Sequence, residues 1–228
     1  MGISGGGNVM TTTGPDAGAP ASYPVQFDVD YPDRPLNRLT TFFRLILVIP
    51  IVIVLSLVSG QAATIPMEQT RVVFITAGAG GLLFLPVLLL ILFRRKYPRW
   101  WFDWNLELLR FSNRVSTYIT LLRDEYPSTD EQQAVHLDIR YPDAERELNR
   151  WLPLVKWLLA IPHYIVLFVF STVTFFVVII SWFAILFTGR YPHALFDFVV
   201  GFIRWQNRVT AYAILLVTDT YPPFRLRA

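Results

Sequence analysis

The sequence has no cysteine, only three histidines and few charged residues, and each shortage removes a class of function. Asp, Glu, Lys and Arg make up 16% of its 228 residues, whereas 54% are hydrophobic. Without cysteine the chain can form no disulfide, no thiolate metal site and no cysteine nucleophile. Three histidines are also too few for a His-rich metal cluster. We therefore expect neither a metal nor a cofactor.

The residue patterns of common enzyme chemistry are missing as well. The sequence contains no Ser-His-Asp order, phosphate-binding loop, HExxH motif or glycine-rich nucleotide fingerprint. Its net charge of +3 comes from basic residues beside apolar runs rather than from basic tracts, which does not indicate nucleic-acid binding. A lipid-modifying enzyme has the least support, because no paired acid and base and no nucleophile stand out. We expect a protein that is not an enzyme.

What the sequence has in excess is long apolar runs. A soluble domain is about 45–50% apolar and about 25% charged, so this composition favours a membrane protein. Residues 41–59 are almost purely apolar, and residues 72–93 contain no charge. Each run is long enough to cross a hydrocarbon core of about 30 Å as a helix, and membrane helices tolerate prolines such as Pro50 and Pro86. We predict a transmembrane hairpin here.

The second half of the chain has one longer apolar run, residues 152–187, in which Lys156 is the one charge. Motifs shared by both halves require the same environment, so each half must cross the membrane an even number of times. We therefore predict two helices with a turn at Ser171-Thr172, and four crossings in all. Helices that begin earlier, near Leu148, and a short hairpin that does not fully span remain alternatives.

Positive charge predicts the direction of these spans. The loop between the first two carries Arg71, balanced by Glu68. By the positive-inside rule both termini and all repeated motifs then face the cytoplasm of a multi-pass protein. The basic residues on that side are Arg34, Arg38, Arg44, Arg94, Arg95, Lys96, Arg99, Arg146, Arg150, Lys156 and Arg190.

Much of the chain occurs twice in the same order. The matching motifs are Leu36-Asn37-Arg38 with Leu148-Asn149-Arg150, Tyr97-Pro98 with Tyr191-Pro192, Asn113-Arg114 with Asn207-Arg208, and Tyr126-Pro127 with Tyr221-Pro222. We expect a disordered tail (1–22), a first repeat (23–127), a linker (128–134) and a second repeat (135–228). Both copies point the same way, which makes them parallel repeats about an axis along the membrane normal.

Each copy begins with an alternating segment. Val25, Phe27 and Val29 share one face of the first, and Val135, Leu137 and Ile139 share one face of the second. Period-two alternation bounded by proline predicts a half-buried strand. Because an isolated strand is unstable, we expect the two to pair with each other or with segments near Tyr126 and Tyr221. An extended arm lying on the membrane is the alternative.

Residues 100–122 and 194–217 are predicted to be amphipathic helices rather than further spans. Asp103, Glu107, Arg110 and Arg114 fall at steps of four, three and four, so they line one helix face. Charge at the bilayer centre is costly, whereas a helix in the interface plane keeps its polar stripe in water and dips its apolar face among acyl chains.

The duplicated polar residues are the candidate site. They are Asp103, Arg110, Asn113, Arg114, Asp197, Arg204, Asn207 and Arg208. One hypothesis is a site for an anion or a lipid headgroup built from the arginines. The other is a structural ion-pair network that locks the two helices together. We also predict that the aspartate of one copy pairs with an arginine of the other, as Asp103 with Arg204.

A family resemblance rests on several of these motifs together. They are Leu36-Asn37-Arg38, Ile161-Pro162-His163, Phe187-Thr188-Gly189-Arg190-Tyr191-Pro192, Leu195-Phe196-Asp197-Phe198 and Thr218-Asp219-Thr220-Tyr221-Pro222-Pro223-Phe224. Over roughly residues 23–226 the chain resembles the bacterial membrane proteins grouped as domain of unknown function 4389, which often carry the unit in tandem. The resemblance implies an integral protein of the bacterial inner membrane and brings no catalytic residues. The first copy departs from the pattern, since Arg94-Arg95-Lys96 replaces Thr188-Gly189-Arg190.

These observations lead to one expected architecture and two candidate functions. We expect a mainly α membrane protein of two parallel repeats, each a transmembrane helical hairpin plus an amphipathic interfacial helix, with a small cytoplasmic β-sheet. The favoured function is a non-enzymatic scaffold or partner-binding unit at the cytoplasmic membrane surface. The alternative is an anionic lipid or anion binder, or a small transporter, that uses the Arg/Asn stripes. Membrane lipids are the expected partners, and a protein partner or a second copy of the chain stays open.

Overall fold

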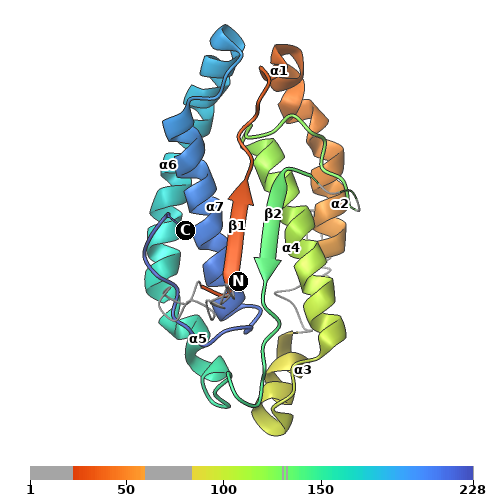
Figure 1. Ribbon diagram of the computed structural model, residues 1–228, viewed down its shortest axis with the longest axis vertical. Helices are drawn as coiled ribbons and strands as arrows, with labels where there is room; N and C mark the ends of the chain where they lie inside the picture. The colour runs from red at the N-terminus through yellow and green to blue at the C-terminus, as the bar shows by residue number, and fades with distance from the viewer. Residues whose placement is uncertain (1–22, 60–83, 130, 132, 228) are drawn as a thin grey trace, which may run out of the picture.

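The chain folds into a mainly helical structure with one two-stranded antiparallel sheet. The computed structural model describes residues 23–59, 84–129, 131 and 133–227. Its elements are β1 (Val25–Val29), α1 (Arg38–Leu47), α2 (Ile49–Ser59), α3 (Phe84–Leu89), a π-helical turn (Leu90–Arg94), α4 (Arg99–Ile119), β2 (Val135–Ile139), α5 (Pro153–Leu159), α6 (Ile161–Thr188) and α7 (His193–Ala213). Figure 1 shows an elongated molecule in which α6 runs along one long side, α1 and α2 run along the other, and the sheet lies between them.

The predicted strands are confirmed, and they pair with each other. Val25 lies opposite Ile139, Phe27 opposite Leu137, and Val29 opposite Val135. Side chains alternate between the two faces of a strand, so the apolar set points to one side and enters the core. The other side presents polar residues, which leaves the sheet with one charged open face.

Each strand packs against a helix from the other half of the chain. Strand β1 contacts α7, and β2 contacts α4. In this antiparallel ladder, hydrogen-bonded residue pairs such as Asp30 with Ala134 and Arg140 with Pro24 alternate with pairs that share no backbone hydrogen bond. In the second kind of pair the backbone carbonyls point outward, away from the partner strand. The Nε of Arg204 donates to the outward carbonyl of Phe27 at 2.7 Å, and the Nε of Arg110 donates to that of Leu137 at 3.2 Å. The two arginines thus occupy edges that would otherwise be open to another strand.

The first predicted span is not one straight helix. Residues 38–59 form α1 and α2, which are bent by 44° at Val48. Pro50 lies just after the bend. In an unbroken helix its ring would clash with the carbonyl of the preceding turn, and its nitrogen has no hydrogen to donate. Helix α1 is amphipathic, and it buries Arg44 against the protein rather than exposing it. For the second predicted span, residues 72–83 lie outside the described part, and residues 84–94 form α3 and the π-helical turn.

The predicted turn at Ser171-Thr172 is wrong. Helix α6 continues unbroken for 28 residues, from Ile161 to Thr188. The hydroxyls of Ser171 and Thr172 both donate back to the carbonyl of Phe168, so these residues sit in a helix without an unsatisfied group. The break falls at Ala160 instead, before Pro162, and it separates α5 from α6. The second half therefore contributes one long apolar helix and not a hairpin.

Helices α4 and α7 form where they were predicted, but their apolar faces are covered by protein. Helix α2 packs on α4, α6 packs on α7, and the strands cover a further face of each. Trp101, Phe111 and Val115 of α4 are almost fully buried, as are Val199 and Trp205 of α7. The expectation that these faces dip among acyl chains is therefore wrong for most of each helix.

Long apolar helices that could cross a membrane are few in the described part of the chain. Helix α6 is long and apolar enough to do so, and the bent pair α1 and α2 would qualify if it acts as one span. Four crossings therefore do not follow from the described residues. The apolar surfaces that are exposed lie mainly on α1, α2, α5 and α6.

Candidate functional site

A broad pocket of about 920 Å³ lies on the sheet between α4 and α7. Four of the predicted arginines line it. They are Arg110, Arg114, Arg204 and Arg208, and Arg225 joins them from the C-terminal segment. The carboxylates in the lining are Asp28, Glu107 and Asp138, so five positive charges face three negative ones and leave a net charge of +2. A site of this composition attracts anions.

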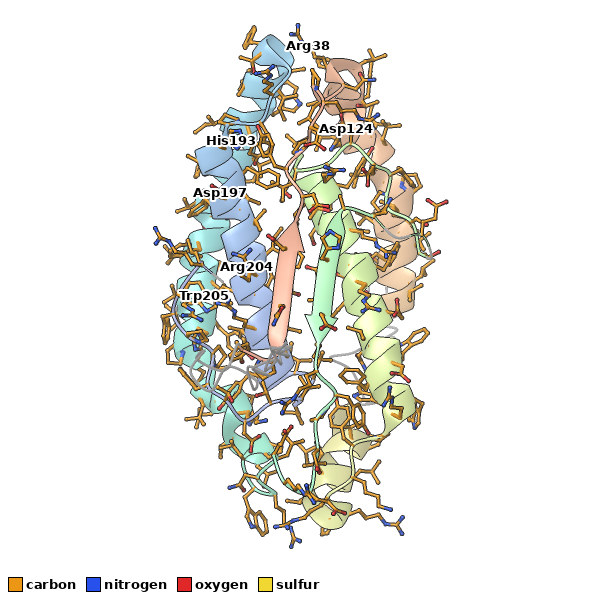
Figure 2. The ribbon with its side chains drawn as sticks, in the orientation of Figure 1. Arg38, Asp124, His193, Asp197, Arg204 and Trp205 are labelled. Carbon is orange, nitrogen blue, oxygen red and sulfur yellow. The ribbon has the colours of Figure 1, made fainter. Side chains whose placement is uncertain are left out.

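Two of the five arginines are paired with acids. Arg110 contacts Glu107 at 2.6 Å, one helical turn away on α4. Arg204 contacts Asp28 on β1 at 3.0 Å, and Figure 2 shows it on the stretch of α7 beside that strand. Because both arginines also donate to strand carbonyls, they act mainly as links between helix and sheet.

The other two helix arginines are held by carbonyls. Arg114 donates to the carbonyl of Ser128 at 2.8 Å. Arg208 donates to the carbonyls of Arg225 and Arg227 at 3.3 and 3.0 Å. Among the described residues, no carboxylate lies within 4 Å of either guanidinium. Their charges are buried and oriented but not neutralised.

The electrostatics of Arg208 reflect this environment. Burial lowers its pKa, and the nearby charges of Arg225 and Arg204 lower it further. The ring of Tyr23 lies 5.8 Å below the guanidinium and favours its charged form. The guanidinium groups of Arg204, Arg208 and Arg225 thus concentrate positive charge on one side of the pocket.

Asn113 and Asn207 come together directly. Each amide nitrogen donates to the side-chain oxygen of the other, at 3.0 and 2.9 Å, and both residues are buried. This reciprocal pair joins α4 to α7 beneath the sheet. The sequence placed both residues in the candidate set, and the structure assigns them to the helix contact rather than to the pocket.

The predicted pairing of Asp103 with Arg204 is wrong. Asp103 contacts Arg99 at 3.6 Å on its own helix, where both side chains are exposed. Arg204 is held by Asp28 instead. Asp197 is exposed on α7 and does not line the pocket (Figure 2). The arginine does reach the other half of the chain, but its acid lies on a strand.

Two buried cation–carboxylate pairs were not anticipated. Arg44 of α1 pairs with Asp124, donates to the carbonyl of Tyr118 and lies 4.3 Å from that tyrosine ring. In the second half, Lys156 of α5 contacts Asp219 at 2.7 Å and lies 5.2 Å from the ring of Tyr212.

Each acid in these pairs also accepts a backbone N–H from the segment that precedes the first helix of its half. Asp124 accepts from Asn37, and Asp219 accepts from Asn149. The two clusters thus fasten the first helix of each half to the segment that follows α4 or α7. A sequence signal existed, since Arg44 and Lys156 each lie six residues after an Asn-Arg motif and each acid lies two residues before a Tyr-Pro.

Tyrosine hydroxyls make further matched links between the halves. Tyr31 donates to the carbonyl of Tyr191, and Tyr141 donates to that of Tyr97 at 2.6 Å. The rings of Tyr31 and Tyr141, each the first residue of a Tyr-Pro motif, therefore cross from one half to the other. No group of three histidine or acidic side chains within the described ranges is placed to hold a metal ion.

Fold and site together define a mainly helical protein with exposed apolar helices and an arginine-lined pocket on a small sheet. A family model described as a domain of unknown function (DUF4389) matches residues 151–225, about a third of the chain. That range holds α5 to α7 and three of the pocket arginines, and the match supports the family resemblance there. No curated protein and no solved structure matches the chain.

Proposed function

We propose that this chain is a membrane-attached binding unit of the bacterial inner membrane that holds an anionic group in the arginine-lined pocket. The observation that carries the proposal is the charge of the pocket, in which five arginines face three carboxylates. The anionic group is a phosphate or carboxylate on a partner or a small molecule in the aqueous phase. The protein thereby acts as a scaffold at the membrane surface and not as an enzyme.

The proposal includes the repeat and its placement. The two halves are a tandem repeat, supported by the equivalent contacts of Arg44 and Lys156 and by the left-handed backbone of Leu121 and Leu216. The pocket and both described ends of the chain face the cytoplasm, because exposed basic residues flank the apolar helices and the positive-inside rule puts such residues on that side. The proposal does not include several crossings of the membrane, because α6 is one helix where two crossings were expected.

Anion binding to the purified full-length protein tests the proposal, with inorganic phosphate as the probe in isothermal titration calorimetry. R225Q removes an exposed positive charge from the pocket, and D138N removes an exposed negative one. A charge about 6 Å from the anion, screened by water, changes the free energy of binding by roughly 0.7 kcal/mol, or about threefold. We expect R225Q to weaken phosphate binding and D138N to strengthen it.

Arg227 provides the matched control, because it is exposed and its side chain does not line the pocket. R227Q changes the net charge of the protein as R225Q does and should leave binding unchanged. Equal effects of R225Q and R227Q would indicate nonspecific attraction to a basic protein and would contradict the site. Native mass spectrometry of the same preparations separates the sources, since a retained anionic lipid lost in R225Q would place the anion on a lipid headgroup.

A further inference from the structure

We propose that α6 does not cross the bilayer but lies parallel to its surface, with the long axis of the molecule in the membrane plane. The partner is the acyl-chain region of one leaflet, which receives the exposed sides of α1, α2, α5 and α6. The charged open face of the sheet then points into water. This inference rests on the membrane attachment proposed above and adds the orientation and depth of each element.

The neighbours of α6 argue against an upright helix. Its 28 residues span about 42 Å, and its midpoint falls between residues 174 and 175. The ring of Phe170 stacks on Phe198 at 5.9 Å and meets Trp205 at 5.6 Å. Phe170 is therefore about 7 Å from the midpoint of α6 along its axis, and α7 runs alongside at that level.

Charged side chains sit beside those contacts. Asp197 precedes Phe198 and is exposed, and Arg204 precedes Trp205 (Figure 2). If α6 stood upright and centred in the membrane, both charges would lie within the hydrocarbon core, whose half-thickness is about 15 Å. Charged groups at that depth are among the most costly placements in a bilayer. An upright α6 would therefore place Asp197 and Arg204 of α7 in the hydrocarbon core.

The open face of the sheet also carries charges that would be costly in the hydrocarbon core. It lies midway along the long axis of the molecule, beside α7 (Figure 1). The side chains of Asp28, Asp30 and His136 on this face are 72%, 62% and 61% exposed. In an upright molecule these groups would also lie near the bilayer centre, whereas in a flat molecule they remain in water.

The basic residues give an independent argument, because they gather at both ends of the long axis. One end holds the start of α1 and the end of α6, and the other holds α3 and α5 (Figure 1). Exposed basic residues at the first end are Arg34, Arg38 and Arg190, and those at the second are Arg94, Arg95, Lys96, Arg99, Arg146 and Arg150. An upright molecule would place one cluster on each side of the membrane, against the positive-inside rule. A flat one brings both to the anionic headgroups of one leaflet.

The exposed apolar surface fits a lipid partner. Leu45 of α1, Leu57 of α2 and Phe168 of α6 are 80%, 77% and 74% exposed. The polar residues of α6 that are buried, His163, Thr174 and Ser181, follow a single stripe turned toward the protein. Trp151 and Trp157, before and within α5, are also largely exposed, as is typical of indole rings at the headgroup level. Charge at the ends and apolar side chains between them match the two zones of one leaflet.

The absence of cysteine makes the orientation directly testable. Single-cysteine variants R190C and R146C mark the two ends, and D28C marks the open face of the sheet, all at exposed positions. A membrane-impermeant maleimide is applied to intact spheroplasts and to inside-out vesicles of the expressing bacterium. F175C, near the midpoint of α6, is the matched position that lipid should shield.

The in-plane orientation predicts that R190C, R146C and D28C all react in inside-out vesicles and not in spheroplasts, while F175C reacts in neither. Labelling of R190C and R146C from opposite sides, with D28C shielded, would overturn it. Labelling of the three from outside alone keeps the flat orientation but contradicts the cytoplasmic side. Release of the unmodified protein by alkaline carbonate would refute membrane attachment itself, and phosphate binding by the pocket would then still be measured separately.

A second measurement needs no variant. Oriented circular dichroism of the protein in aligned bilayers distinguishes helices that lie in the membrane plane from helices along its normal. Helices α4, α6 and α7 run along the same long axis (Figure 1), so the flat molecule gives the in-plane spectrum. The spectrum of helices along the normal would exclude the proposed orientation.

Discussion

The buried ion pair of Lys156 and Asp219 offers the sharpest test of how the first helix of the second half is held. Lys156 is fully buried, its Nζ lies 2.7 Å from Asp219, and it also donates to the carbonyl of Thr218 at 2.8 Å. Burial lowers the pKa of Lys156, and Asp219 opposes that shift. Replacing Lys156 by Met keeps the length of the side chain but leaves a carboxylate without its cation.

The expected cost follows from what Asp219 loses. Breaking a buried pair by removing one partner costs about 3–5 kcal/mol. Asp219 keeps 19% of its side chain exposed and still accepts the N–H of Asn149, so we expect the lower end, about 3 kcal/mol. For a chain of this length that corresponds to a decrease of roughly 6–12 °C in Tm. Thermal unfolding in detergent, followed by circular dichroism, measures the shift.

Two further variants test whether Lys156 and Asp219 form a coupled pair. K156R should cost less than about 1 kcal/mol, because Arg44 makes the equivalent contact in the first half. The double variant K156M/D219N should recover at least half of the loss, since it leaves no unpaired charge. If K156M changed the free energy of unfolding by less than about 1 kcal/mol, or if the losses of K156M and D219N simply added, the pair would not be a coupled buried contact.

Three further outcomes follow from other contacts. N113A should lower the free energy of unfolding by about 1–3 kcal/mol, because it leaves the buried amide of Asn207 unpaired. In the same unfolding assay, the double variant N113A/N207A should lose clearly less stability than the sum of the losses of N113A and N207A. G201A should loosen the C-terminal segment, since a Cβ there would lie 2.8 Å from the Cβ of Leu226; faster tryptic cleavage after Arg225, followed by mass spectrometry, would reveal it, and an unchanged rate would contradict it. In D219N the pKa of Lys156 in the folded protein should fall further below 10.5, because Asp219 no longer opposes the effect of burial. Between that lowered pKa and 10.5 the unfolded chain binds more protons than the folded one, so the stability of D219N should rise with pH across this range. A Tm that does not change with pH would argue that Lys156 stays charged.

The strands and the amphipathic helices could be predicted because their signals are local. Val25, Phe27 and Val29 alternate with polar residues, and that pattern is sufficient to specify a strand with one buried face. The α4 stripe of Asp103, Glu107 and Arg110 likewise follows from helical spacing alone. Neither signal depends on which distant segment completes the contact.

The break between α5 and α6 lies at Ala160 and not at the predicted position. Symmetry with the first half favoured a turn at Ser171-Thr172, yet hydroxyl residues fit inside a helix when they bond back to a carbonyl. The stronger local signal was Pro162, which disfavours an unbroken helix through Ala160. Parity of crossings was an assumption about the environment and not a property of these residues.

Within the candidate site, the sequence predicted which arginines take part, but it did not predict the residues that they contact. The sequence indicated Arg204 and Arg208 because both are duplicated, but it gave no means to place Asp28 beside Arg204, 176 residues away. It likewise could not place Arg225, whose position depends on how the last segment folds back over α7.

The sequence by itself determined the pieces of this protein: the apolar runs, the alternating strands, the polar stripes and the matched motifs of the two halves. These follow from the spacing of side chains along one segment, so they need no information about distant residues. Only the tertiary structure decided that each strand packs on the helix of the other half and that the arginines converge on one pocket. The physical reason is that such contacts depend on which surfaces bury each other best in three dimensions, and many pairings are compatible with the same local pattern.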